Sequence, residues 1–131
     1  MAAKSSALRV LVVEDEFLIR WAVAETLACA GHIVIEAEDG AAAVRALTTP
    51  AEPVDAVLLD YRLPDSNDLT LLATIRWIAP NSSVILMTAY GTPEVTEAAL
   101  DLGVYKVIGK PFEMNSLAPL LDEACASSHR L

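Results

Sequence analysis

VLLDYRLPD, residues 57–65, runs from strand-forming residues directly into an acid. Val57, Leu58 and Leu59 are fully apolar and favour a strand that is buried on both faces. The run ends on Asp60, and Pro64 prevents the strand from continuing. A buried strand would therefore place a carboxylate at its carboxyl-terminal end, where an ionised group needs compensation.

Similar apolar runs recur along the chain, and longer segments with helical spacing separate them. With the first stretch included, the runs are 8–13, 32–37, 53–60, 83–89 and 104–109. Continuous Val, Ile and Leu strands are typical of a parallel sheet with helices on both faces. Right-handed crossovers then give a doubly wound α/β fold of five strands and five helices, (βα)5.

The segments between the strands carry recognisable helix signals. The predicted helices are about 19–30, 40–47, 69–78, 93–102 and 115–126. Thr92 and Pro93 suit the start of the fourth, and Gly31 and Gly103 lie just past the first and fourth. Pro119 must either fall in the first turn of the last helix or kink that helix.

Length and composition limit the classes of protein. A chain of 131 residues that is 54% apolar fits one domain with a real core, and disorder is excluded as a general description. We expect a flexible N-terminus (1–7), one domain (8–126) and a tail (127–131). The start Met and the polar tail favour a complete protein. Without a membrane-length apolar run or a signal peptide, the expected location is the cytoplasm, with no membrane partner.

Charge and the potential metal ligands argue against two further classes. The net charge is −9 and the basic residues are scattered, so this chain is not expected to bind nucleic acid. Cys29 and Cys125 are predicted to be small buried thiols. His32 and His129 lie too far apart in sequence to suggest a zinc site.

Polar side chains follow four of the predicted strands, and in a parallel sheet these strand ends share one edge. They are Glu14, Asp15, Glu16, Asp60, Thr88 and Lys110. Singly, each has an ordinary explanation, such as a helix cap for Glu16 or a solvated charge for Lys110. Together, crowded carboxylates raise one another's pKa unless a cation is present.

Asp15 and Asp60, with Glu14 nearby, suit Mg²⁺, which prefers carboxylates and water. A carboxylate can also attack phosphorus to form an aspartyl phosphate, and a lysine would offset the charge on the transferring group. The residues expected at this edge of the sheet therefore predict a metal-assisted phosphoacceptor site.

The chain resembles the receiver domains of two-component response regulators over about residues 8–126. The matching stretches are VLVVEDE (10–16), VLLDYRLPD (57–65), MTAYG (87–91) and GKPF (109–112). The resemblance implies a flavodoxin-like sheet of order 2-1-3-4-5, Mg²⁺ as cofactor, and a histidine kinase or histidine phosphotransferase as phosphodonor.

The resemblance also implies a role for each site residue. Asp60 is the phosphoacceptor, Glu14 and Asp15 form the acidic pair, Thr88 and Lys110 contact the phosphoryl group, the backbone carbonyl of Arg62 binds metal, and Lys110–Pro111 is cis. Such a domain would be a phosphorylation switch, catalysing only its own phosphorylation and dephosphorylation, and a monomer or weak dimer. Its effector is unknown, and an additional output domain is an open question.

The chain departs from the family pattern at two places. Asn67-Asp68 stands where Asp-Gly is usual, at a position that often needs a positive φ. Val107 stands where many members carry a switching aromatic residue, and strand alternation predicts that Tyr105 shares its face. We therefore expect phosphorylation to be read out through the loop after Thr88, with little ring movement on the fifth strand.

Two other functions are alternatives to a phosphorylatable receiver. A degenerate receiver that only binds protein is disfavoured by the intact acids, Thr88 and Lys110. A hydrolase of the haloacid-dehalogenase type needs a second acid two residues after the nucleophile, where this chain has Arg62.

On the first helix, Leu18 and Trp21 lie outside the stripe that faces the core, and they are a candidate docking patch. The alternative is a partly buried Trp.

Overall fold

The computed structural model describes residues 7–49, 52–66, 68–89 and 91–128. Its centre is a parallel sheet of order β2-β1-β3-β4-β5. The strands are β1 (Arg9–Val13), β2 (Ile33–Ala37), β3 (Ala56–Asp60), β4 (Ser83–Thr88) and β5 (Lys106–Gly109). The predicted doubly wound α/β fold and its strand order are confirmed.

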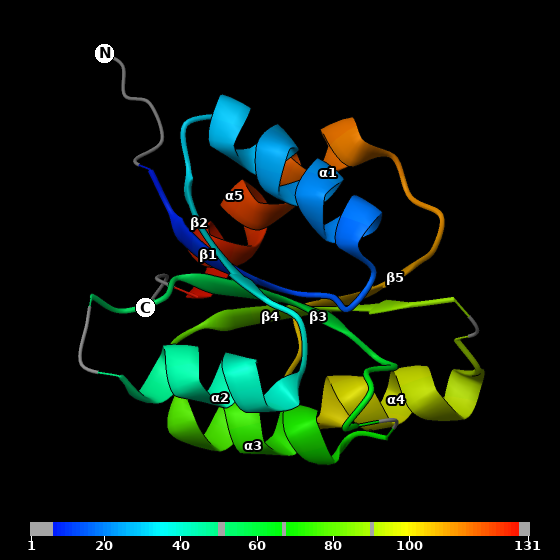
Figure 1. Ribbon diagram of the computed structural model, residues 1–131. Coiled ribbons are helices and arrows are strands. Elements are labelled where there is room, and N and C mark those ends of the chain that lie inside the picture. The colour runs from blue at the N-terminus through cyan, green and yellow to red at the C-terminus, as the bar shows by residue number, and fades with distance from the viewer. Residues whose placement is uncertain (1–6, 50–51, 67, 90, 129–131) are drawn as a thin grey trace.

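Helices cover both faces of the sheet, with α1 and α5 on one side and α2, α3 and α4 on the other (Figure 1). They are α1 (Phe17–Cys29), α2 (Gly40–Thr48), α3 (Thr70–Ile78), α4 (Pro93–Asp101) and α5 (Leu117–Ser128), the last preceded by a 3₁₀ turn, Met114–Ser116. The last helix runs two residues further than predicted, and Pro119 lies in its first turn, where a missing N–H is tolerated. No helix in the described ranges has the length and apolarity that a bilayer crossing requires.

The ends of the helices follow the local sequence signals. The Asp39 side chain accepts a hydrogen bond from the backbone N–H of Ala42 at 2.8 Å, and Thr92 caps Val95 in the same way at 3.2 Å. Gly31 and Gly103, just past α1 and α4, have φ of 96° and 103°, a left-handed conformation that favours glycine. These signals fix where α2 and α4 start and where α1 and α4 end.

Two apolar cores fill the spaces between the sheet and its helices. Leu11, Leu59, Leu72 and Ile75 belong to the core beside α2 and α3, and Leu27, Ile85 and Leu121 to the core beside α1 and α5. The central strands β3 and β4 are buried throughout, as predicted. The edge strand β2 is not, because only β1 flanks it, and its Ile33 is exposed.

Two predictions about single residues are wrong. Tyr105 packs in the core beside α1 and α5, whereas Val107 packs in the core on the opposite face. Strand alternation does not apply, because Tyr105 precedes Lys106, the first residue of β5. Cys125 is buried as expected, but Cys29, at the last turn of α1, is exposed.

Some expectations fall on parts of the chain outside the described residues. These are most of the N-terminal segment 1–7, residues 129–131 of the tail, and Asn67. Asp68 is described, and φ is negative there, as at every described residue except the two glycines. Its carboxylate instead accepts from the N–H of Thr70 at 2.9 Å, which supports the start of α3.

Candidate functional site

The predicted polar residues meet at the carboxyl-terminal edge of the sheet, on the right-hand side of Figure 1. They line a cavity of about 280 Å³, together with Tyr61, Arg62 and Ala89. The residues from the predicted set are Glu14, Asp15, Glu16, Asp60, Thr88 and Lys110. They converge because β1, β3, β4 and β5 are parallel and in register, so their carboxyl ends lie side by side.

Asp60 is the last residue of β3, and only 6% of it is exposed. Its carboxylate lies 3.2 Å from the Lys110 ammonium and 3.4 Å from the backbone N–H of Arg62. Burial, and secondarily the charge of Glu14, raise the pKa of Asp60 from 3.8 to about 6, despite the opposing effect of Lys110. At neutral pH the group is thus mostly ionised and is a stronger base than an ordinary aspartate.

Glu14 is completely buried at the end of β1, and two donors occupy its carboxylate. Lys110 Nζ lies 2.7 Å from one oxygen, and the backbone N–H of Glu16 donates to the other at 3.1 Å. Burial opposes the charge on Lys110, but its hydrogen bond to Glu14 and the charges of both acids raise the Lys110 pKa overall. Lys110 is therefore a permanent cation held between Glu14 and Asp60.

The backbone of the β5–α5 connection also fixes Lys110. Its N–H donates to the Thr88 carbonyl at 2.9 Å, and the peptide bond to Pro111 is cis, as predicted. Thr88 is buried at the end of β4 and contributes to the same cavity wall. Thr88 and Lys110 thus come from strands on the opposite side of β3 from β1, and the Lys110 ammonium reaches back to contact both Asp60 and Glu14.

The acids form a potential metal site. One carboxylate oxygen from each of Glu14, Asp15 and Asp60 lies within 4.8 Å of the others, and Asp15 is exposed. Hard oxygen donors with access to water are what Mg²⁺ requires, and Arg62 borders the same cavity. The donor set and its excess of negative charge fit a divalent cation.

Two features of the β1–α1 turn did not follow from the sequence. Arg20 Nη1 donates to the Glu14 carbonyl at 2.9 Å, its Nε donates to Glu36 at 3.0 Å, and the guanidinium lies 5.7 Å from the centre of the Phe17 ring. Glu16 lies at the N-cap position of α1, as its ordinary explanation expects, but its side chain makes no capping bond. Arg20 thus supports the turn that carries the acids, and only its place one turn into α1 could have suggested this.

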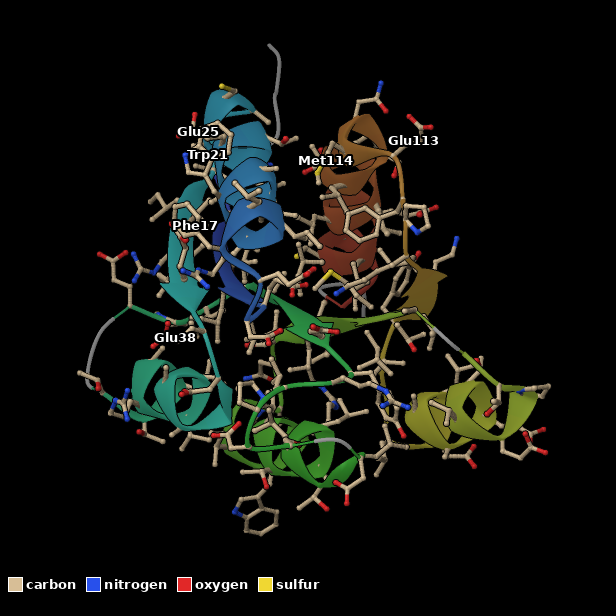
Figure 2. All side chains as sticks on the ribbon, turned by 45° about the vertical axis from the view of Figure 1, so that its right-hand side comes forward. Phe17, Trp21, Glu25, Glu38, Glu113 and Met114 are labelled. Atoms are coloured by element: carbon tan, nitrogen blue, oxygen red, sulfur yellow. The ribbon has the colours of Figure 1, made fainter. Side chains whose placement is uncertain are left out.

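An apolar surface adjoins the acidic cavity. A second cavity of about 360 Å³ has Ile19, Phe112 and Met114 among its walls and shares Lys110 with the first. On α1, Leu18 is 74% exposed and Trp21 52%. Figure 2 shows Phe17, Trp21 and Glu25 along one side of α1. The predicted patch is therefore exposed, and Trp21, which is about half exposed, also fits the alternative of a partly buried Trp.

Comparisons with known proteins converge on one family. The family profile of the response regulator receiver domain matches residues 10–122. The chain is 30% identical over 109 residues to sporulation initiation phosphotransferase F of Bacillus subtilis (strain 168), covering 83% of this chain and 86% of that protein. It is 33% identical over 115 residues to the DNA-binding transcriptional regulator NtrC of Escherichia coli (strain K12), covering 88% of this chain and 24% of NtrC. The chain thus spans about a quarter of the length of the first curated relatives.

Solved structures agree with this result. The receiver domain of NtrX from Brucella abortus is 32% identical, with a TM-score of 0.80 over 90% of this chain and 98% of that one. A CheY-like receiver domain from Methanospirillum hungatei JF-1 has a TM-score of 0.87 over 94% and 97% of the two chains. At 24% identity, the second likeness concerns the fold alone.

Proposed function

Because this chain belongs to the response regulator receiver domain family, we propose that its Asp60 carboxylate accepts a phosphoryl group from a phosphohistidine. Receiver domains are signalling modules of two-component systems, and the donor would be a histidine kinase or a histidine phosphotransferase acting in the cytoplasm. One observation carries the assignment to Asp60. It is a buried carboxylate at a strand tip, 3.2 Å from a lysine ammonium and in reach of other acids.

The proposed step is a phosphoryl transfer between two side chains. A carboxylate oxygen of Asp60 forms the new bond to phosphorus, the phosphorus–nitrogen bond to histidine breaks, and the imidazole nitrogen keeps the electron pair. Lys110, already beside Asp60, would offset charge on the phosphoryl oxygens, and the Thr88 hydroxyl would donate to one of them. The raised pKa of Asp60 fits an acceptor that is both ionised and nucleophilic near neutral pH.

Mg²⁺ is the cation that we propose for the acidic cavity. Asp15, Asp60 and the Arg62 backbone carbonyl would be its protein ligands. Glu14 would contribute mainly charge, because Lys110 and the N–H of Glu16 already occupy its oxygens. When bound, the ion would neutralise the acids and the incoming phosphoryl oxygens.

Intact-mass measurement after incubation with a small phosphodonor and Mg²⁺ tests the proposal. We expect one phosphoryl group per chain, none in Asp60→Asn, and strongly reduced labelling in chelator or in Asp15→Asn. Asp101→Asn, which removes an exposed acid at the end of α4, is the matched control and should label normally. A labelled Asp60→Asn protein, or full labelling in chelator, contradicts the assignment.

A further inference from the structure

The turn that follows β3 is held by its own backbone. The N–H of Leu63 donates to the Ser66 carbonyl at 2.7 Å, and the N–H of Ser66 donates back to the Leu63 carbonyl at 3.2 Å. The Leu63 side chain is buried in the core beside α2 and α3. Pro64 and Asp65 therefore form the tip of a tight four-residue turn that begins one residue after Arg62.

Asp65 ties this tip to a distant part of the chain. One carboxylate oxygen accepts from the N–H of Gly40 at 2.8 Å, and the other accepts from the N–H of Ala41 at 3.0 Å. These are the first residues of α2, whose N–H groups have no partner inside the helix. The bond from Gly40 is the main reason that the Asp65 pKa is lowered. A Cβ on residue 40 would lie 3.1 Å from Asp65 Oδ1, so glycine permits this close approach.

The turn determines the direction of the Arg62 carbonyl. This carbonyl and the N–H of Leu63 belong to one planar trans peptide unit, in which the two groups point in opposite directions. Because the N–H is directed at Ser66, the carbonyl must be directed away from Ser66. Arg62 itself lines the acidic cavity. Whatever holds the Leu63–Ser66 turn in place therefore also orients this carbonyl.

We propose that Asp65 is a positioning residue for the divalent cation: by clamping the Leu63–Ser66 turn to the start of α2, it holds the Arg62 carbonyl in place as a ligand. This rests on the metal site of the proposed function. Asp65 does not touch the cation. It acts through two hydrogen bonds and one peptide unit, and residues outside the ligand set often change metal affinity in this way.

Mg²⁺ titration of the phosphoryl-free protein, followed by calorimetry or by backbone amide shifts, tests the role of Asp65. Asp65→Ala should weaken Mg²⁺ binding about tenfold. Asp65→Asn keeps one acceptor oxygen and should fall between Asp65→Ala and the wild type. Asp68→Ala is the matched control, because it removes an exposed acid of the same loop that caps Thr70 of α3 instead. It should bind Mg²⁺ nearly as the wild type does.

The readouts separate positioning from general stability or charge. Faster hydrogen exchange at the Gly40 and Ala41 amides would show that the clamp is open in Asp65→Ala. Thermal unfolding without Mg²⁺ reports stability separately. An equal loss of affinity in Asp65→Ala and Asp68→Ala would assign the effect to charge and overturn the proposal, as would wild-type affinity in Asp65→Ala. If the wild type itself fails to bind Mg²⁺, the metal site of the proposed function fails, and this inference fails with it.

Discussion

The two edges of the sheet differ in how their charged side chains are paired. At the amino-terminal edge, the Arg76 guanidinium of α3 donates to backbone carbonyls of Leu102 at 3.2 Å, Ser82 at 3.0 Å and Pro80 at 3.4 Å. It thereby joins the end of α4 to the start of β4. At the carboxyl-terminal edge, Glu14 and Asp60 share one cation, Lys110. The first edge pairs its charge with backbone groups, and the second keeps an excess of negative charge.

The charged group at the amino-terminal edge therefore supports stability, whereas the acids at the carboxyl-terminal edge suit the proposed function. The carbonyls at helix and strand ends need donors, and a guanidinium satisfies several at once. Adjacent buried acids instead repel one another, and burial penalises their charged forms. Such a cluster does not add to stability, which fits the proposed binding of a cation and a phosphoryl group at this edge.

The largest expected effect is at the acidic edge: without metal, Asp60→Asn should make the protein more stable at neutral pH. The folded-state pKa of Asp60, about 6, lies above its unfolded value of 3.8. The stability that this group contributes is therefore fully present below pH 3.8 and is lost as pH rises through 6. Asn cannot ionise, so the variant should gain up to about 3 kcal/mol above pH 7.

Urea unfolding in chelator between pH 4.5 and 8 measures this gain. The difference between Asp60→Asn and the wild type should shrink towards the acid end of the range. It should also shrink at neutral pH when Mg²⁺ is added, because the ion stabilises only the folded wild type that binds it. A variant that is less stable than the wild type at pH 8 would show that the ionised Asp60 does not destabilise the metal-free protein.

Arg76→Ala tests the opposite edge. Removing the guanidinium leaves the carbonyls of Leu102 and Ser82 without this donor, which should lower the free energy of unfolding by roughly 1–3 kcal/mol. Mg²⁺ affinity and labelling by a small phosphodonor should stay at wild-type levels, since the cavity lies at the far ends of the strands. Denaturant unfolding and a Mg²⁺ titration of the same sample decide this. Loss of Mg²⁺ affinity in proportion to stability would mean that the edges are coupled.

Sequence predicted the carboxyl edge better than it predicted the contacts that support it. Unbroken Val, Ile and Leu runs imply a parallel sheet, and a parallel sheet brings Glu14, Asp60 and Lys110 together whatever the details of the loops. The bond of Arg20 to the Glu14 carbonyl could be suggested only by its place one turn into α1, and the bonds of Asp65 join segments that only the finished fold brings together. Tyr105 lies on the face opposite to the predicted one, because β5 begins at Lys106, two residues after the start of the predicted run 104–109.

Trp21→Ala tests whether the apolar patch beside the acidic edge binds a partner protein. Phe17, Leu18 and Trp21 are exposed in the first two turns of α1, the helix that follows the acids of β1. We expect transfer from the cognate phosphohistidine protein to slow about tenfold, as for a truncated interface anchor. Labelling by a small phosphodonor should not change. Trp77→Ala, which removes an exposed Trp from α3, is the control, and equal loss with both donors would make Trp21 merely structural.

The smallest expected change concerns how phosphorylation is read out, and it again distinguishes the two edges. Thr88 lies in the acidic cavity, and a Cβ on residue 91 would be 3.0 Å from its Cγ2, so Gly91 lets the following loop approach Thr88 closely. Val107 has no ring to rotate. Tyr105 lines a cavity at the amino edge with Arg76 and packs on the face opposite Val107. Tyr105 is therefore poorly placed to act in place of the missing aromatic residue.

A phosphoryl group can shift the conformation only through contacts that differ between the two states, and its proposed contacts are Thr88 and Lys110. We expect backbone amide shifts on beryllofluoride binding to concentrate in residues 88–95, from Thr88 to the first turn of α4. The Tyr105 ring signals should stay nearly constant. Gly91→Ala should reduce the loop response while sparing Mg²⁺ binding, because the added methyl would press on Thr88 and not on the acids. A Tyr105 ring that becomes buried while residues 89–95 remain unchanged would place the readout at the amino edge instead.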